Sequence, residues 1–530
     1  MSSSWVGLMA ALSALLVAGS GAAAVIDVPP GADLQAALDS ARPGDTVALQ
    51  PGATYIGTFT LGVKDGASYV TVRSALPDAQ LPATGTRMTP SLAANLARLV
   101  SPNGDAAIRT APGAHHWRLF ALEVRGASGG GGDLIRLGDG SDQQRSFGDV
   151  PHDLVIDRCY IHGSPGVSQK RGVALNSAST SVLNSWISDI KASGQDSQAI
   201  AGWNGPGPFS IRNNYLEAAG ENFMTGGADP AIDGLVPTGI TFRDNWVRKP
   251  VEWRGSTWQV KNLLELKNAR GVVIEHNLFE NNWEAAQPGF AILFTPRNQD
   301  GNAPWTAVQD VTFRSNVVRH VAAAINILGH DSPYPSQQTR EVTIAGNLVY
   351  DVNPQGWGGN GAFLMIGDEP AGVTVEHNTV LQSGNIVIVY SGPVNRFVFR
   401  NNLALHNDYG IKGDSHGVGN DSISAYFPGA AITGNVIAGG PSSQYPSGNQ
   451  FPSVSQFYSQ FVSAASDNYE LVPSSGYAKA ATDGTAVGAN AGVIGSVMSV
   501  ALNGIGDAGR PRPPGSQPAG TARPRIGGKG

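Results

Sequence analysis

IRNNYL at residues 211–216 returns as FRDNWV at 242–247, as IEHNLF at 274–279 and as FRSNVV at 313–318. Each copy follows the pattern apolar, any, polar, Asn, any, apolar. Four further copies surround Asn347, Asn378, Asn402 and Asn435, and two degenerate copies place Cys159 and Ser185 at the Asn position. A segment that recurs in this way indicates stacked structural units.

The spacing of the copies predicts the kind of unit. From Asn214 to Asn435, successive Asn positions lie 31, 32, 39, 31, 31, 24 and 33 residues apart. Each unit contains short β-branched or aromatic runs, such as Val342-Thr343-Ile344, and lacks the longer 3.6-residue periodicity of helical repeats. The pattern therefore predicts an all-β chain, a single-stranded right-handed parallel β-helix built as a solenoid of coils.

We expect the repeated Asn residues to be structural. Asn tolerates left-handed backbone at a bend, and stacked Asn side chains can hydrogen-bond from one unit to the next as a ladder. The prediction is one line of side chains at a bend, formed by Asn214, Asn245, Asn277, Asn316, Asn347 and Asn378.

The two ends of the chain differ from the repeats. An apolar stretch from residue 6 to 17, followed by small residues up to Ala24, predicts a signal peptide over residues 1–24 and thus secretion to the periplasm or the outside. Residues 25–503 are expected to form the β-helix, with a short N-terminal capping helix at 33–39. Residues 504–530 are rich in Gly, Pro and Arg, which predicts a disordered tail.

Composition narrows the classes of function. The 530 residues include 68 Gly and 34 Pro and only 14% are charged, which suits many short strands and tight turns. A net charge of −6 argues against nucleic acid as a partner, and no stretch is apolar for long enough to predict a transmembrane segment. The single cysteine, Cys159, excludes an intrachain disulfide. We expect a monomer, as is usual for a capped solenoid.

The segment from Arg243 to Arg270 is the basic part of an acidic chain. It contains seven basic residues against three acidic ones, a local balance of +4. A basic zone of this kind favours a polyanionic ligand. The alternative interpretation is a solvated face with scattered charges.

Within this segment, residues 263–268 are predicted to form a strand. Alternation places Glu265 and Lys267 on one face and the leucines between them on the other. Arg297 ends the equivalent strand one coil later, and because parallel strands lie about 4.8 Å apart, Lys267 and Arg297 can reach one ligand. Further candidate substrate-binding residues lie on neighbouring coils or in loops over the same face: Asp196, Gln198, Trp203, Glu221, Asn222, Arg254, Trp283, Asn298, Asn326 and His330.

The chain resembles the pectin-lyase-like superfamily of right-handed parallel β-helices over roughly residues 25–500. The resemblance rests on the Asn-bearing repeats, the helix at 33–39, the Pro43-Gly44-Asp45 turn and a closing segment at 468–490. This architecture hosts lyases, hydrolases, esterases, epimerases and adhesins, so it implies a fold rather than a reaction.

The Lys and Arg on adjacent coils resemble the alginate and chondroitin lyase branch of that superfamily. The resemblance implies Lys267 as general base, Arg297 as general acid, and a calcium ion bound by Glu265 and Asn262. Removing a proton beside a carboxylate requires neutralisation of the developing enolate charge, and calcium prefers oxygen ligands. The expected function is β-elimination on an acidic polysaccharide.

Two other functions stay open. A non-catalytic polysaccharide-binding or cell-surface protein is one, because Trp residues in loops can stack on sugar rings in a binder as well as in an enzyme. A glycoside hydrolase on the same fold is the other, although the adjacent Asp-Asp and Gly-His-Gly segments of galacturonase-type hydrolases are absent. A lyase needs Lys267 and Arg297, whereas a binder does not.

Overall fold

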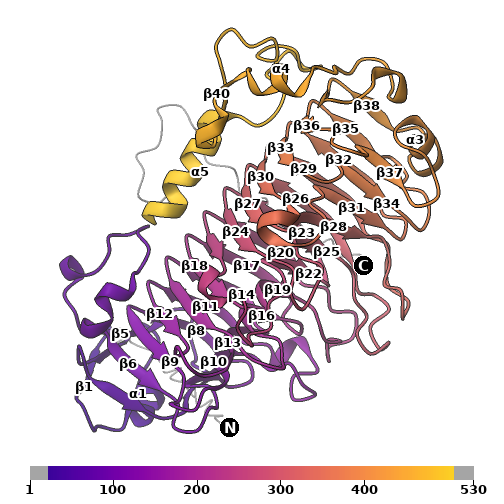
Figure 1. The fold of residues 1–530 in the computed structure, drawn as a ribbon. Coiled ribbons are helices and arrows are strands. Elements are labelled where there is room, and N and C mark those ends of the chain that lie inside the picture. The colour runs from indigo at the N-terminus through magenta and orange to yellow at the C-terminus, as the bar shows by residue number, and fades with distance from the viewer. Residues whose placement is uncertain (1–21, 507–530) are drawn as a thin grey trace, which may run out of the picture.

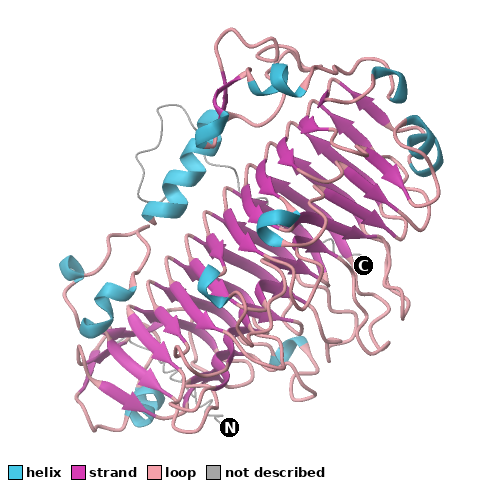
Figure 2. Ribbon diagram, viewed as in Figure 1, coloured by secondary structure: helices cyan, strands magenta, loops and turns pink. Residues whose placement is uncertain are grey.

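The computed structural model describes residues 22–506, and most of the predicted signal peptide and tail lies outside them. The chain winds through three long sheets of 14, 12 and 13 strands, which we call the first, second and third sheets, and in which neighbouring strands are parallel (Figures 1 and 2). Each coil passes from the first sheet to the third, then to the second, and enters the first sheet again. The fold is the predicted right-handed parallel β-helix.

Within each sheet the strands succeed one another in chain order. The first sheet contains β1 (Val25–Val28), β2 (Thr46–Leu49), β5 (Val70–Ser74), β8 (His115–Phe120), β11 (His152–Asp157), β14 (Ala178–Leu183), β17 (Gly207–Arg212), β20 (Thr238–Arg243), β23 (Ala269–Glu275), β26 (Val308–Arg314), β29 (Arg340–Ala345), β32 (Ala371–Glu376), β35 (Val398–Arg400) and β38 (Ala431–Thr433). The second sheet contains β4 (Phe59–Leu61), β7 (Ile108–Thr110), β10 (Gly131–Leu137), β13 (Gln169–Leu175), β16 (Gln198–Gly202), β19 (Glu221–Thr225), β22 (Leu264–Leu266), β25 (Phe290–Phe294), β28 (Ala323–Leu328), β31 (Leu364–Gly367), β34 (Val387–Val389) and β37 (Ile411–Gly413). The third sheet contains β3 (Thr54–Ile56), β6 (Ala97–Val100), β9 (Leu122–Arg125), β12 (Tyr160–His162), β15 (Trp186–Ile190), β18 (Tyr215–Ala218), β21 (Trp246–Arg248), β24 (Leu278–Asn282), β27 (Val317–Val321), β30 (Leu348–Val352), β33 (Thr379–Gln382), β36 (Leu403–Leu405) and β39 (Val436–Ala438).

The core is a column of side chains in the interior of the coils. Its largest members include phenylalanines that pack from coil to coil, with ring centroids 6.1 Å apart for Phe242 and Phe279 and 5.8 Å for Phe279 and Phe313. Burying such side chains contributes about 1.5–3 kcal/mol each, and because the column grows with every coil, the chain needs no second core.

The Asn ladder is confirmed at the bend between the first and third sheets. The backbone amide and the side-chain amide of Asn245 both donate to Asn277 Oδ1, at 2.9 and 3.0 Å, and Asn277 donates in the same way to Asn316. The hydrogen bonds continue through Asn347, Asn378, Asn402, Asn435 and Asn449. Every one of these side chains completes the bend of the coil before it.

One detail of the Asn prediction was wrong. Left-handed backbone belongs to the residue before each ladder Asn, for example Asp244 (φ 59°), His276 (φ 57°) and Ser315 (φ 52°), and not to the ladder Asn itself. The left-handed residue turns the chain outward and leaves the next side chain pointing inward. The free thiol of Cys159 occupies an early, fully buried rung, where its amide donates to Ser185 Oγ at 3.1 Å.

The N-terminal end of the column is covered by a helix. α1 (Leu34–Ser40) is the predicted capping helix; the Asp33 side chain accepts from the Ala36 amide, and Leu34 and Leu38 pack into the core. Three short helices lie in loops, namely α2 (Pro354–Trp357), α3 (Asn420–Tyr426) and α4 (Val454–Tyr458). No helix in the described part, residues 22–506, is long and apolar enough to cross a membrane.

After β39 the chain turns back along the outside of the third sheet (Figure 1). This returning segment contains the antiparallel pair β40 (Phe461–Ser463) and β41 (Asn468–Leu471), followed by α5 (Ala491–Asn503), which packs Ile494, Val497 and Ala501 against that sheet. At its end, the buried Arg87 donates to the carbonyl oxygens of Ala501 and Asn213. Segments far apart in the sequence are thereby joined over the Asn bend.

Candidate functional site

β22 and the residue that follows it present two charged side chains on the outer face of the second sheet. Leu264 and Leu266 lie in the core, whereas Glu265 and Lys267 point outward, with Lys267 Nζ 3.5 Å from Glu265 Oε1. The alternation predicted from the sequence is confirmed. The side chain of Lys267 is 17% exposed, so solvent or a ligand reaches it.

Arg297 lies one coil further along the same face. Its backbone amide donates to the Lys267 carbonyl oxygen at 2.9 Å, which places the two residues on adjacent coils as predicted. The guanidinium donates to Asp331 Oδ1 at 2.9 Å and remains 33% exposed. Each candidate catalytic cation is therefore held by a carboxylate while part of its side chain stays accessible.

Glu265 is enclosed by polar neighbours. Asn262 Nδ2 donates to Glu265 Oε2 at 2.9 Å. Burial raises the pKa of Glu265, since desolvation disfavours the carboxylate, and the nearby Lys267 ammonium acts against this rise. The two predicted calcium ligands thus lie in contact, beside the candidate base.

A separate row of polar side chains lies beside Glu265 and extends over the four preceding coils. Aligned outer positions of the second sheet carry Asp133, Arg171, Gln198 and Glu221. Arg171 binds Asp133 at 2.7 Å and Gln198 at 3.2 Å, and Gln198 donates to Glu221 at 2.9 Å. This row brings the predicted residues Gln198 and Glu221 together, both of them buried.

Lys261 links that row to Asp196. Its ammonium lies 2.5 Å from Asp196 Oδ2 and 3.6 Å from Glu221 Oε1. The sequence interpretation missed Asp133 and Arg171 and did not count Lys261 among the site residues. Aligning the strands of the second sheet by register would have found the first two, because they share positions with Gln198 and Glu221.

Two predicted binding residues are buried and do not lie at the ligand-facing surface. Asn222 points into the interior, where it donates to the Leu216 and Arg248 carbonyls, because its position lies at an inward corner of β19. Asn298 is fully buried and binds the Asp331 carboxylate and the Pro335 carbonyl. Placing Asn222 at the ligand-facing surface was wrong, and Asn298 instead supports the loop that follows Arg297.

One other predicted residue, Asn326, keeps the expected face. Asn326 is aligned with Leu293, which is aligned with Glu265, so all three share one outer row. The Asn326 Oδ1 atom is buried without a hydrogen-bond partner. His330 follows β28 and is half-buried.

The predicted Trp loops lie on opposite sides of this face. Trp203 follows β16 and donates from its indole to the Gly140 carbonyl at 2.8 Å, beneath the Arg171 guanidinium. Trp283 precedes β25 and is almost buried in a cluster with Trp253 and Val260. The Arg254 guanidinium lies 5.8 Å from the Trp283 ring and 5.2 Å from the Trp357 ring.

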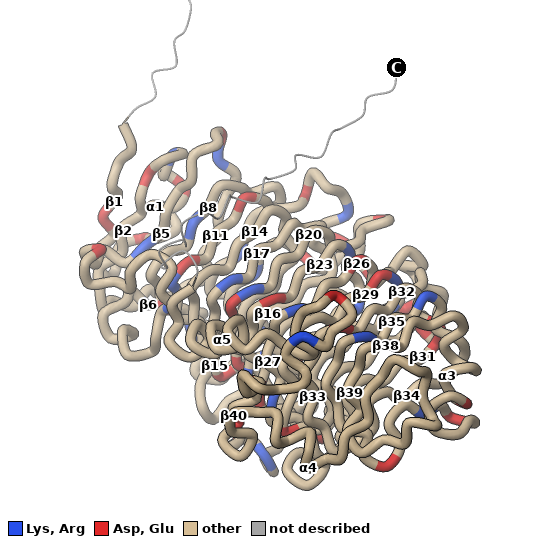
Figure 3. The backbone as a smooth tube through the Cα atoms, turned by 90° about the horizontal axis from the view of Figure 1, so that it is seen from above, with Lys and Arg blue, Asp and Glu red and all other residues tan. Residues whose placement is uncertain are grey.

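The basic zone predicted over residues 243–270 is not one surface. Arg243 pairs with Glu275 on the first sheet, Arg248 lies near Glu280 on the third, and Lys249 is buried in the interior. About 30 residues complete one coil, so charges that are neighbours in sequence are distributed around three faces. Figure 3 shows basic and acidic segments side by side along the coils.

The site fits calcium only in part. Asn262 Oδ1 is buried without a hydrogen-bond partner, which leaves an oxygen ligand unused beside Glu265. However, Lys261 and Lys267 already lie against the carboxylates, and residues 22–506 contain no group of three Asp, Glu, His or Cys residues that could hold a metal ion. We therefore derive no step through calcium, and calcium binding stays a prediction.

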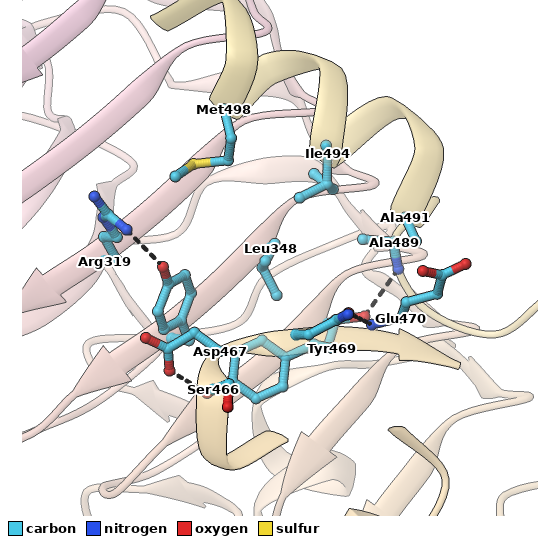
Figure 4. A pocket seen from close by; sticks show the side chains of 14 residues that line it. Arg319, Leu348, Ser466, Asp467, Tyr469, Glu470, Ala489, Ala491, Ile494 and Met498 are labelled. Atoms are coloured by element: carbon cyan, nitrogen blue, oxygen red, sulfur yellow. Dashed lines mark hydrogen bonds between the residues drawn. The ribbon is translucent and has the colours of Figure 1, made fainter. Parts of the chain in front are cut away.

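A cavity of about 520 Å³ lies away from this site, between the third sheet and the returning segment (Figure 4). Arg319 and Tyr350 line it from the sheet, Tyr469 from β41, and Ile494 and Met498 from α5. Arg319 donates to the Tyr350 hydroxyl at 3.0 Å and binds Glu280.

Several solved structures are similar to this chain at low sequence identity. A mannuronic acid-specific polysaccharide family 6 lyase from human gut microbiota is 12% identical, with 81% of this chain and 83% of that chain covered and a TM-score of 0.43. A family 6 polysaccharide lyase from Pseudopedobacter saltans is 14% identical, with coverages of 82% and 89% and a TM-score of 0.41. A pectate lyase is 13% identical, with coverages of 88% and 93% and a TM-score of 0.33.

No family model and no curated protein matches the chain. The solved structures are too distant in sequence and in geometry to indicate a reaction. The fold is established by the three parallel sheets of the chain itself.

Proposed function

We propose that the protein is a secreted carbohydrate-active β-helix that cleaves an acidic polysaccharide by β-elimination at the outer face of the second sheet. The observation that supports this most is the placement of Lys267 and Arg297 on adjacent coils, each partly exposed and each held by a carboxylate. Two cationic groups one strand apart suit a substrate whose reacting carbon lies beside a carboxylate.

In the proposed reaction, the neutral amine of Lys267 takes the proton from the carbon beside the uronate carboxylate. The electron pair of that C–H bond forms a carbon–carbon double bond, and the glycosidic carbon–oxygen bond breaks. Arg297, as general acid, donates a proton to the leaving oxygen. Lys267 then releases the proton that it took to solvent, and Arg297 regains one from solvent. Asp331 orients the guanidinium, and Glu265 orients the Lys267 side chain.

The test is cleavage of alginate, pectate and glycosaminoglycans, measured by the absorbance of the unsaturated product. Because general acid–base groups contribute about 10²–10⁴-fold, Lys267→Ala and Arg297→Ala should abolish measurable turnover and leave the fold intact. Lys412→Ala is the matched control, since Lys412 stands in an outer row of the same sheet at β37, far from the site. If Lys267→Ala keeps most of the wild-type activity, the lyase assignment fails.

A polysaccharide binder is the second candidate, favoured by the ion pairs that already hold both cations. Such a protein would bind one of these polymers and cleave none. A hydrolase is the third, favoured by Glu265, whose pKa is raised by burial as a general acid requires, and by the neighbouring Glu221. A hydrolase would release a reducing end without an unsaturated product.

Calcium dependence is tested separately, by adding calcium or a chelator to the cleavage assay and to thermal unfolding. If Glu265 and Asn262 bind the ion, Glu265→Gln should weaken both the activation and the shift in melting temperature. Equal activity and stability with calcium and with chelator would remove calcium from the proposal.

A further inference from the structure

Lys249 is a fully buried lysine in the interior of the β-helix. It follows β21 directly and points back toward the previous coil. Its ammonium lies 3.0, 2.9 and 2.6 Å from the carbonyl oxygens of Ala218, Ala219 and Gly220, 3.0 Å from Asn222 Oδ1 and 2.9 Å from the Asn262 carbonyl oxygen. Five oxygen atoms surround one nitrogen.

These five oxygens belong to two adjacent coils. Ala218, Ala219, Gly220 and Asn222 lie where the chain passes from β18 to β19. Asn262 lies two residues before β22, which carries Glu265 and is followed by Lys267. Gly220 immediately precedes Glu221. The ammonium therefore ties together the two chain segments from which Glu221 and Asn262 project toward the outer face.

Lys249 also closes the base of an insertion. Residues 250–262 leave the coil after Lys249 and rejoin it where the Lys261 amide donates to the Ala219 carbonyl. This insertion carries Arg254 and Trp253, which belong to the aromatic cluster beside the site. One buried cation thus anchors both the insertion and the adjacent polar row.

The five oxygen atoms offer more acceptors than a neutral amine can use. An ammonium offers three hydrogens to the five oxygens, whereas a neutral amine offers two. Burial lowers the pKa of Lys249 to about 7, because desolvation disfavours the ammonium, while the Glu221 carboxylate acts in the opposite direction. A methylene chain without the nitrogen would leave these oxygens facing an apolar group.

We propose that Lys249 is a positioning residue for the candidate site, an internal cation that sets the relative placement of the coils carrying Glu221 and Glu265. The part of this inference that concerns turnover rests on the proposed function. The part that concerns coil placement does not, and it is measured without a substrate.

The experiment compares Lys249→Met with Lys191→Met by hydrogen exchange at residues 218–225 and 261–266. Lys191 is the matched control because it is also nearly buried, but its ammonium binds Asp189 on the outer side, over the Trp253 ring. We expect exchange in these two segments to become faster in Lys249→Met alone. Wild-type protection in both segments of Lys249→Met would overturn the proposal.

If Lys249→Met does not fold, the proposal can be tested with Lys249→Ala and added ammonium. The shortened side chain leaves room for a free ammonium ion among the five oxygens. Ammonium chloride should raise the melting temperature of Lys249→Ala more than that of the wild type, and tetramethylammonium chloride at equal ionic strength should not. The absence of an ammonium-specific rise would count against the proposal.

Once a substrate is known, Lys249→Met should reduce turnover by about 10- to 100-fold, as expected when reacting groups are misplaced by about 1 Å. Ammonium should restore part of the turnover of Lys249→Ala. Lost protection with wild-type turnover would overturn the positioning role and leave the lyase assignment standing. If the wild type cleaves nothing, the lyase proposal fails, and hydrogen exchange still decides the role of Lys249.

Discussion

The bend between the first and third sheets and the bend between the third and second sheets satisfy buried polar groups in different ways. At the first bend, each interior ladder Asn accepts hydrogen bonds from the Asn of the preceding coil and donates to the Asn of the next, as Asn277 does between Asn245 and Asn316. At the bend between the third and second sheets, no residue repeats in this way among the coils of the site. In one coil Lys249 donates to the Asn262 carbonyl, and in the next coil Asn282 donates to the Gly289 carbonyl.

The second bend also varies in length. Two residues separate β18 from β19, whereas residues 249–263 separate β21 from β22 and residue 322 alone separates β27 from β28. A ladder of identical side chains requires the same number of residues in the bend of every coil, because each side chain must contact the equivalent one in the next coil. A bend whose polar groups are satisfied differently in each coil permits insertions. These insertions carry the aromatic residues and Arg254 beside the candidate site. The uniform bend stabilises the stack, and the variable bend accommodates the insertions beside the candidate site.

Replacing an interior rung should have the largest effect on stability. Asn277→Ala removes the acceptor of two Asn245 donors and the donor to the Phe242 carbonyl and Asn316 Oδ1. Several buried groups are then left without partners, each costing about 1–3 kcal/mol, so we expect a loss of about 3–5 kcal/mol in the free energy of unfolding. Denaturant unfolding followed by circular dichroism measures it.

Two variants serve as controls for that rung. Asn449→Ala changes the last, half-buried rung and should cost less, since water can reach the groups it leaves. Asn277→Ser should also cost less than Asn277→Ala, because Ser185 already occupies a rung and accepts from the Cys159 amide. Equal losses for Asn277→Ala and Asn449→Ala would show that the ladder does not act as a buried network.

The uniform bend was predictable from the sequence, and the reason is physical. A ladder needs the same residue at the same place in each coil. The recurrence of Asn at positions 214, 245 and 277 therefore indicates both the length of a coil and the place of its bend. The left-handed position was assigned one residue too late, since the pattern fixes the bend but not which of the two neighbouring residues has positive φ. The capping helix followed from the spacing of Leu34 and Leu38.

The candidate site was predictable only where it follows strand alternation. Glu265 and Lys267 alternate with two leucines, and their outward direction was correct. Asn222 lies at a corner where alternation breaks down, and Lys249 lies at the start of an insertion of unpredictable path, so neither side chain could be oriented from the sequence. Local charge balance also failed, because one coil spreads consecutive charges over three sheets.

The contribution of Lys249 to the free energy of unfolding should depend on pH. This effect should be smaller than that of replacing an interior ladder Asn. The pKa of Lys249 in the folded chain is about 7, below the ordinary value of 10.5, so between these values the unfolded chain binds more protons than the folded one. Stability from this group therefore rises as the pH increases through that window. The difference in unfolding free energy between wild type and Lys249→Met should grow between pH 6 and pH 9 by on the order of 2 kcal/mol. A difference that is constant with pH would mean that the five oxygens fully offset the desolvation.

The smallest expected effect concerns the outer residue of the uniform bend. Ser315 has φ 52° immediately before Asn316, and the equivalent position in the next coil is Gly346, with φ 64°. Glycine adopts positive φ without the penalty that a side chain brings, so Ser315→Gly should leave stability unchanged or raise it by about 0.5–1 kcal/mol. Asn316→Gly, one residue later, should instead be strongly destabilising, since that side chain is a buried rung. Thermal unfolding of the two variants side by side separates the backbone role of the first position from the hydrogen-bonding role of the second. A marked loss in Ser315→Gly would show that the Ser315 side chain supports the bend in a way that backbone conformation does not explain.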